Sequence, residues 1–167
     1  MSLLARIFNW KAKRYKDMIL ERLDIDENSI VADIGPGGGL LTKEFATRAK
    51  KVYAVDVDKK LLEHVKKKTR RFDNVQTILV EKSTELPKKM DLIFMRNVYH
   101  HLTDRINYFR NLKQFLKGEL VIIDWEKEKG HGTPRERIIN ELTEAGYKLD
   151  DEHIIPKQSF LKFIPSK

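Results

Sequence analysis

The chain contains no cysteine at all. Disulfide bridges, thiol nucleophiles and cysteine metal sites are therefore excluded. The chain also lacks a long hydrophobic run, because no stretch approaches the roughly 20 apolar residues that cross a bilayer. Residues 1–8 are too short, and too soon interrupted by charge, for a secretory signal peptide. We therefore expect a cytoplasmic protein without a membrane span.

The composition suits one compact domain. Hydrophobic residues form 41% of the 167 residues and charged residues 35%, which is enough apolar material for a sizeable core. A disordered chain pairs low hydrophobicity with a lack of periodicity, and neither applies here. No internal repeat or low-complexity linker marks a domain boundary. The sequence therefore predicts a single domain.

Positive charge is concentrated in one part of the chain. The 33 basic and 25 acidic residues give a net charge of +8. The segment 43–71 has 11 Lys or Arg against 4 Asp or Glu, so it supplies +7 of this total. Such a patch attracts polyanions through counterion release, but a solvated helix face gives the same pattern. Both interpretations stay open.

The hydrophobic pattern alternates between the periods of a strand and of a helix. Short β-branched runs predict strands, and apolar residues three or four apart predict helices. The predicted strands are 30–34, 52–55, 75–80, 92–95 and 120–123. The predicted helices are 10–23, 40–48, 58–68 (with Asp58 as N-cap) and 104–116.

A further helix is marked by its ends. Thr133 is the predicted N-cap, Pro134 occupies the first helical position and Glu136 completes a capping box. Gly146 stands where a left-handed residue ends a helix. The sequence therefore predicts a helix between Thr133 and Gly146.

Two strands end the chain. Residues 147–155 and 158–164 are separated by Pro156 and predict a hairpin. Strands that alternate with helices form a mostly parallel sheet with helices on both faces. The predicted fold is thus an α/β, doubly wound and mostly parallel sheet, with a C-terminal antiparallel hairpin at its edge.

A glycine-rich loop follows the first predicted strand and opens a helix. It reads Asp33-Ile34-Gly35-Pro36-Gly37-Gly38-Gly39. In such sheets, ligands bind beyond the carboxyl ends of the strands, where glycines let the backbone approach closely. Asp56 ends the second strand 17 residues after Gly39, where a carboxylate can accept both ribose hydroxyls. Together these features predict a cofactor that contains adenosine.

The spacing of the loop narrows the choice of cofactor. A dinucleotide fingerprint requires a third glycine where this chain has Leu40, and a phosphate-binding loop requires a Lys that is absent. A nicotinamide-dependent oxidoreductase is therefore disfavoured. The acidic Asp33 would repel phosphates and suits a cationic ligand. The loop thus favours a cofactor with an ammonium and a sulfonium group.

These motifs resemble those of class I S-adenosylmethionine-dependent methyltransferases. The segment 31–39 is similar to the first motif of the family, and 55–58 to its acidic second-strand motif. The segments 85–87 and 90–102 resemble the fourth-strand region, most closely in quinone-biosynthesis and other small-molecule methyltransferases. The resemblance implies a Rossmann-like fold of seven strands, with the last one antiparallel. It also implies S-adenosylmethionine as cofactor and S-adenosylhomocysteine as product.

The resemblance assigns the cofactor contacts. Asp33 would order the loop and the methionine amino group, and Asp56 would hold the ribose. The floor of the site would be formed by the glycines Gly35, Gly37 and Gly39. Glu81 and Ser83 are both candidates for the adenine contact, and Asn97 would face the methionine or the methyl group.

The catalytic candidates follow the fourth predicted strand. A base assists methyl transfer to a hydroxyl or a carbon acid, and histidine is suited to this role. His100 is the preferred base, although His101 and a structural role for both stay open. Tyr99 would stack on the acceptor or cover the core. The run 124–126 is a candidate lining of the acceptor pocket, and no residue is predicted to bind a metal.

The acceptor itself stays open. In this family an N-terminal helical segment, here 1–29, would cover the acceptor side of the domain 30–167. Its apolar face favours a small hydrophobic or planar molecule. RNA or protein is the alternative acceptor, because of the basic segment 43–71. A non-catalytic nucleic-acid-binding module of the same fold is the alternative from a different class.

Overall fold

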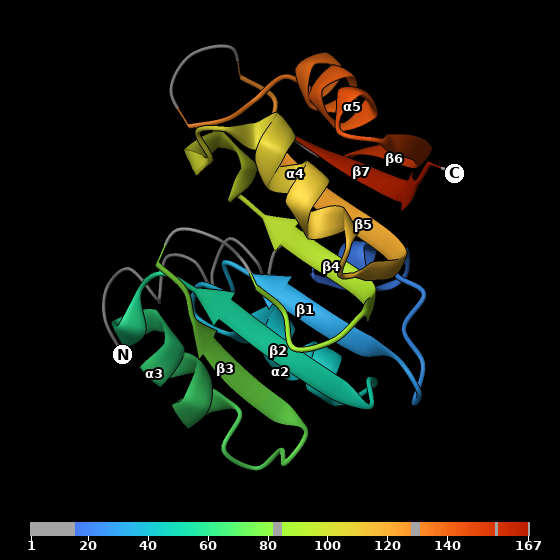
Figure 1. Ribbon diagram of the computed structural model, residues 1–167. Coiled ribbons are helices and arrows are strands. Elements are labelled where there is room, and N and C mark those ends of the chain that lie inside the picture. The colour runs from blue at the N-terminus through green and yellow to red at the C-terminus, as the bar shows by residue number, and fades with distance from the viewer. Residues whose placement is uncertain (1–15, 82–84, 128–130, 156, 167) are drawn as a thin grey trace. The chain divides into compact units, whose positions relative to one another are not determined.

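The computed structural model describes residues 16–81, 85–127, 131–155 and 157–166 (Figure 1). The chain divides into two compact units, 1–82 and 83–167, and each is described by itself. The predicted division into segment 1–29 and domain 30–167 stays a prediction. Of the predicted helix 10–23, residues 16–20 are helical and residues 10–15 lie outside the described part.

The first unit alternates strands with helices. Its elements are β1 (Ile30–Ile34), α2 (Leu40–Ala46), β2 (Lys51–Asp56), α3 (Lys59–Lys68) and β3 (Val75–Leu79). β2 pairs in parallel with both β1 and β3, which gives the order β3-β2-β1. The carboxyl ends of these strands therefore meet at one edge, where ligands bind in sheets of this kind.

Burial explains why the first unit folds in this way. Most residues of β1 and β2 are buried, as their continuous β-branched runs predict for parallel strands. α3 packs against β2 and β3 and buries Leu61, Leu62 and Val65 on its inner face. The Asp58 carboxylate accepts the backbone N–H groups of Lys60 and Leu61, which confirms the predicted cap.

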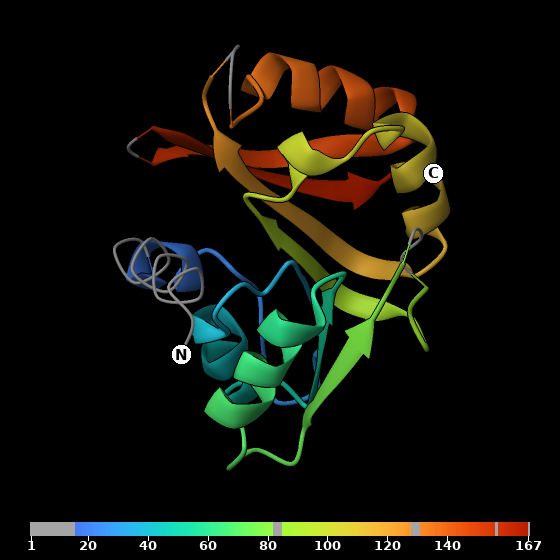
Figure 2. The ribbon, with the colours of Figure 1, turned by 90° about the vertical axis from the view of Figure 1, so that its left-hand side faces the viewer.

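The described residues of the second unit form four strands. Its elements are β4 (Met90–Arg96), the 3-10 helix η1 (Tyr99–His101), α4 (Arg105–Lys113), β5 (Leu116–Trp125), α5 (Arg135–Glu144), β6 (Tyr147–Ile155) and β7 (Gln158–Pro165). β4 and β5 are parallel, and β7 runs antiparallel to both β5 and β6. The order is thus β4-β5-β7-β6. α5 packs against β6 and α4 (Figure 2).

The C-terminal hairpin is confirmed, but its second strand lies inside the sheet. β7 is inserted between β5 and β6, so β6 forms the edge. Six consecutive residues of β7 are buried, whereas β6 alternates between exposed and half-buried positions along most of its length. Lys162 of β7 is accommodated because its Nζ lies 2.8 Å from Glu119 Oε2 on β5.

Two predicted helix boundaries are wrong. The N-cap of α5 is Pro134, whose carbonyl accepts the N–H groups of Arg137 and Ile138. Thr133 is not the cap, because its own N–H donates to Trp125 O at 2.9 Å and ties it to the end of β5. Leu116, the predicted end of the preceding helix, is instead the first residue of β5.

Candidate active site

The glycine loop after β1 has a backbone that other residues rarely adopt. Gly35, Gly37 and Gly39 have φ angles of 71°, 55° and 72°, in the left-handed region. The Gly35 N–H donates to Val55 O at 2.8 Å, which ties the loop to β2. A Cβ on Gly39 would lie 3.2 Å from Val65 Cα. The glycines are therefore required by the turn, and the loop presents bare backbone to a ligand.

Asp33 lies at the carboxyl end of β1 and is 2% exposed. Its Oδ2 accepts a hydrogen bond of 2.6 Å from the Thr42 hydroxyl. Burial raises the pKa of Asp33 to about 7; the Thr42 hydrogen bond opposes this shift and the charge of Asp56 adds to it. A cation bound at this carboxyl would favour its ionised form. Asp33 thus fits the ammonium group of an amino-acid ligand.

Asp56 ends β2, whose last residues pair with both β1 and β3. Its Oδ1 accepts the Asp58 N–H at 2.9 Å. Burial raises the pKa of Asp56, although hydrogen bonds from the backbone of Asp58 and Val57 oppose the shift. Val57 is 69% exposed despite its apolar side chain.

Of the two candidates for the adenine contact, only Glu81 lies in the described part of the chain. Glu81 follows β3 and is exposed. Ser83 lies outside the described residues.

Asn97 follows β4 and is held from two sides. Its φ of 57° is left-handed, and its N–H donates to Ile123 O at 2.8 Å. Its Oδ1 accepts a hydrogen bond from Gln158 Nε2, and Gln158 Oε1 accepts one from Arg96 Nη2 at 3.0 Å. Sequence reasoning missed Gln158, because its contacts with Asn97 and Arg96 span about sixty residues.

His100 forms a buried pair with Asp124. His100 Nδ1 lies 2.7 Å from Asp124 Oδ1, and the His100 backbone N–H donates to Oδ2 at 3.1 Å. The imidazole is 6% exposed and the carboxylate 0%. With Asp124 as an ionised carboxylate, which only accepts hydrogen bonds, Nδ1 would donate to it and leave Nε2 as the acceptor of the ring. Sequence reasoning placed Asp124 in a pocket lining but missed this contact.

Two further histidines lie beside His100. Its ring centroid is 4.0 Å from that of His101 and 5.9 Å from that of His131. Burial lowers the pKa of His101, and the charges of His100 and His131 lower it further. Only His100 of these three has an ion-pair contact with a carboxylate among the described residues. The described residues contain no group of His, Asp or Glu that could hold a metal ion.

Tyr99 lies in the core of the second unit. It is 0% exposed, and its ring stacks on Phe109 with the centroids 5.5 Å apart. Its hydroxyl donates to Glu141, and the Arg105 guanidinium lies 4.9 Å from its ring centroid. Burial raises the pKa of Tyr99, and its hydrogen bond to Glu141 raises this pKa further. Of the two roles predicted for Tyr99, these contacts agree with covering the core rather than stacking on the acceptor.

Comparison with protein families assigns the chain. Residues 32–123, more than half of the chain, match a family model described as a methyltransferase domain. The chain belongs to this family. A solved S-adenosylmethionine-dependent methyltransferase from Aquifex aeolicus is 25% identical, with a TM-score of 0.73 over 88% of this chain and 87% of that one. The predictions of a class I methyltransferase domain and of S-adenosylmethionine as its cofactor are therefore confirmed; the subgroup stays a prediction.

Other solved structures share the fold. A putative methyltransferase of Haloferax volcanii, solved with the Trm112 methyltransferase activator, has a TM-score of 0.84 at 11% identity, over 98% of this chain and 94% of that one. The N-methyltransferase NodS of Bradyrhizobium japonicum with S-adenosylhomocysteine has a TM-score of 0.74 at 18% identity, over 93% and 87%. The predicted Rossmann-like methyltransferase fold, with seven strands and a C-terminal hairpin, is thus confirmed.

Curated relatives match over shorter parts. A probable ribosomal RNA small subunit methyltransferase A of Methanococcus maripaludis is 40% identical over 68 residues, which is 41% of this chain and 26% of that protein. The uncharacterized protein MJ1452 of Methanocaldococcus jannaschii is 27% identical over 84% of this chain and 44% of its own length. The chain thus spans less than half of these relatives. Among the described residues, no helix is long and apolar enough to cross a bilayer.

Proposed function

We propose that the protein transfers a methyl group from S-adenosylmethionine to a small-molecule acceptor, with His100 as the general base. The observation that carries this proposal is the 2.7 Å contact between His100 Nδ1 and Asp124 Oδ1. This buried pair gives the methyltransferase domain a proton acceptor of fixed orientation. A base of this kind serves acceptors that lose a proton, such as phenols and carbon acids.

The first unit supplies the donor site in this proposal. Asp33 binds the methionine ammonium, Asp56 binds the ribose hydroxyls, and the loop of Gly35, Gly37 and Gly39 lies against the ligand. The buried carboxyl of Asp33 and the side-chain-free turn support these roles. Glu81 and Ser83 stay candidates for the adenine contact, and Asn97 for the methionine or the methyl group.

When bound, S-adenosylmethionine supplies an electrophilic methyl group on sulfur and leaves as S-adenosylhomocysteine, which keeps the electron pair of the broken carbon–sulfur bond. His100 Nε2 takes the proton that the acceptor atom loses as its new bond to carbon forms. Asp124 holds the ring in the required tautomer and stabilises the resulting imidazolium. Tyr99, fixed through Glu141 and Phe109, anchors η1, which carries His100, so its role is positioning.

The low exposure of the imidazole supports a small acceptor. With 6% of the His100 side chain accessible, a slender or planar molecule reaches Nε2 more readily than a folded polymer. The test is acceptor-dependent formation of S-adenosylhomocysteine by the purified chain with a panel of phenols, quinols and carbon acids. We expect turnover with one of these classes and its loss in His100→Gln. Turnover only with amines or with RNA would contradict the proposal.

RNA is the second candidate acceptor. It is favoured by the 40% identity to the probable ribosomal RNA small subunit methyltransferase A of Methanococcus maripaludis over 68 residues, and by the basic segment 43–71. The same assay with small-subunit ribosomal RNA as acceptor distinguishes it. Methyl incorporation into that RNA, without turnover of any small molecule, would support this candidate.

A further inference from the structure

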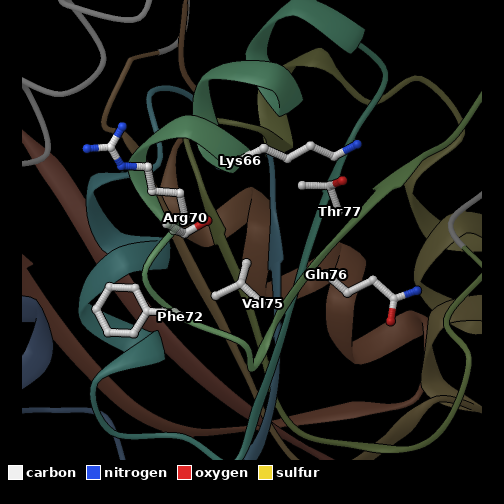
Figure 3. A pocket seen from close by; sticks show the side chains of 7 residues that line it. Lys66, Arg70, Phe72, Val75, Gln76 and Thr77 are labelled. Atoms are coloured by element: carbon white, nitrogen blue, oxygen red, sulfur yellow. The ribbon is translucent and has the colours of Figure 1, made fainter.

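A basic groove lies between α3 and β3 of the first unit (Figure 3). It encloses about 420 Å³. Its cationic side chains are Lys66 of α3 and Arg70, which follows α3. Its polar side chains are Gln76 and Thr77 of β3, and its apolar ones are Phe72, in the connection between α3 and β3, and Val75 at the start of β3.

Among the described residues, none that lines the groove is acidic. Lys66 and Arg70 are exposed, and no ion pair is found for either within the described ranges. Residues 59–71 contain seven Lys or Arg and a single Glu. The groove therefore attracts anions.

The groove is separate from the donor site. Gln76 pairs with Tyr53 in the parallel register, whereas Asp56 pairs with Leu79. The three residues between these positions correspond to about 10 Å along the strands. The groove thus lies toward the amino ends of β2 and β3, and the glycine loop and Asp56 at their carboxyl ends.

We infer that this groove binds single-stranded nucleic acid, with Lys66 and Arg70 on the phosphates and Phe72 against a base. Proteins bind such strands with cations and aromatic rings. The cations neutralise the phosphates and release counterions, and the aromatic rings stack on the faces of the bases. Phe72 is half-buried and lines the groove. The exposed Gln76 supplies an amide for hydrogen bonds to base edges. This inference does not depend on the acceptor of the methyl group.

The test is fluorescence anisotropy of labelled oligonucleotides of about 12 nucleotides. At about 50 mM salt, we expect Lys66→Glu/Arg70→Glu to weaken binding at least roughly tenfold. The matched control is Lys88→Glu/Lys89→Glu, which makes the same change of charge at two exposed lysines of the other unit. We expect this control to change the affinity less than about twofold.

Two further variants separate charge from stacking. Lys66→Gln/Arg70→Gln should lower the slope of log affinity against log salt by about 1.4, or 0.7 per phosphate contact. Phe72→Leu should weaken binding and leave this slope unchanged, because it removes the stacking face but no charge. RNA and DNA strands are compared to identify which nucleic acid is bound.

Three results would overturn the inference: no binding at low salt, an equal loss in the Lys88/Lys89 control, or binding of anionic lipid vesicles without binding of either strand. The thermal shift produced by S-adenosylhomocysteine is measured for every variant. It should equal that of the wild type, so a failure of the groove cannot be confused with a failure of the donor site.

Discussion

Asp33 combines burial with negative charge. A carboxyl group that is 2% exposed and has no cationic partner among the described residues destabilises the fold when it ionises. Its folded pKa of about 7 lies above the ordinary value of 3.8 for an Asp carboxyl group. The folded, ligand-free protein thus keeps the proton between about pH 4 and 7. Across this window the contribution of Asp33 to stability decreases as the pH rises.

Asp33→Asn should therefore raise the melting temperature of the ligand-free protein at pH 8, since it removes a buried charge. It should also abolish the binding of S-adenosylhomocysteine, because the ammonium loses its partner. Differential scanning fluorimetry and calorimetric titration measure the two effects. Unchanged affinity in the variant would contradict the role of Asp33.

The pH dependence of ligand binding provides a separate prediction. The ammonium pairs with the ionised form of Asp33, so the affinity of the wild type should fall as the pH is lowered through about 7. Calorimetric titrations between about pH 5.5 and 8.5 measure this. An affinity that is flat across this range would show that Asp33 does not pair with the ligand.

The His100–Asp124 pair determines how the reaction responds to substitution. His100→Gln and Asp124→Asn should each lower kcat by about 10²–10⁴-fold, because the first removes the base and the second its orientation. The affinity for S-adenosylhomocysteine should stay that of the wild type. The control is Asp151→Asn, which alters a more exposed pair with His153 at 2.9 Å. A loss of kcat in this control as large as in Asp124→Asn would contradict the assignment.

Helix caps show how far local sequence determines an element. Asp58 is an N-cap whose carboxylate bonds to the backbone, whereas the N-cap Asp104 of α4 makes no such bond. The Asp104 carboxylate instead accepts hydrogen bonds from Asn107 Nδ2, at 3.2 Å to Oδ1 and 3.0 Å to Oδ2. Both helices thus begin after an Asp, but only the predicted cap Asp58 makes a capping bond.

Asp58→Ala should lower the free energy of unfolding by about 1 kcal/mol, the usual cost of a lost cap. Asp104→Ala is the matched control and should cost less than about 0.5 kcal/mol, as exposed substitutions do. Urea denaturation followed by circular dichroism measures both values. Equal costs would contradict the capping geometry.

The two strands of the hairpin differ in their surroundings although they are neighbours in sequence. β7 has neighbours on both sides and six consecutive buried residues, whereas β6 has an alternating pattern. The apolar run of β7 is typical of a strand that is buried on both faces. That run is the signal for an interior position.

The same Leu→Ala substitution should lower the free energy of unfolding far more in the core than at the surface. Leu161 on β7 is 0% exposed, and Leu79 at the end of β3 is 53% exposed. Leu161→Ala should cost about 2–5 kcal/mol, because it leaves a cavity. Leu79→Ala should cost less than about 0.5 kcal/mol. Chemical denaturation measures the difference, and comparable costs would show that β7 is not a core strand.

Periodicity and glycine positions were sufficient for the strands and helices, the glycine turn and Asp56 at the end of β2. Each depends on residues close together in sequence: β-branched runs, apolar residues one helical turn apart, and left-handed positions that only glycine occupies readily. The resemblance of the same short motifs to a known family supplied the cofactor.

Contacts between distant residues required the tertiary structure. The insertion of β7 between β5 and β6, the attachment of Thr133 to Trp125, the burial of Tyr99 against Glu141 and the pairing of His100 with Asp124 join residues that are 8 to 42 positions apart or belong to different strands. Such contacts are decided by which surfaces meet when the core forms. The apolar run of β7 indicates an interior strand, but no local pattern identifies the partners of these residues.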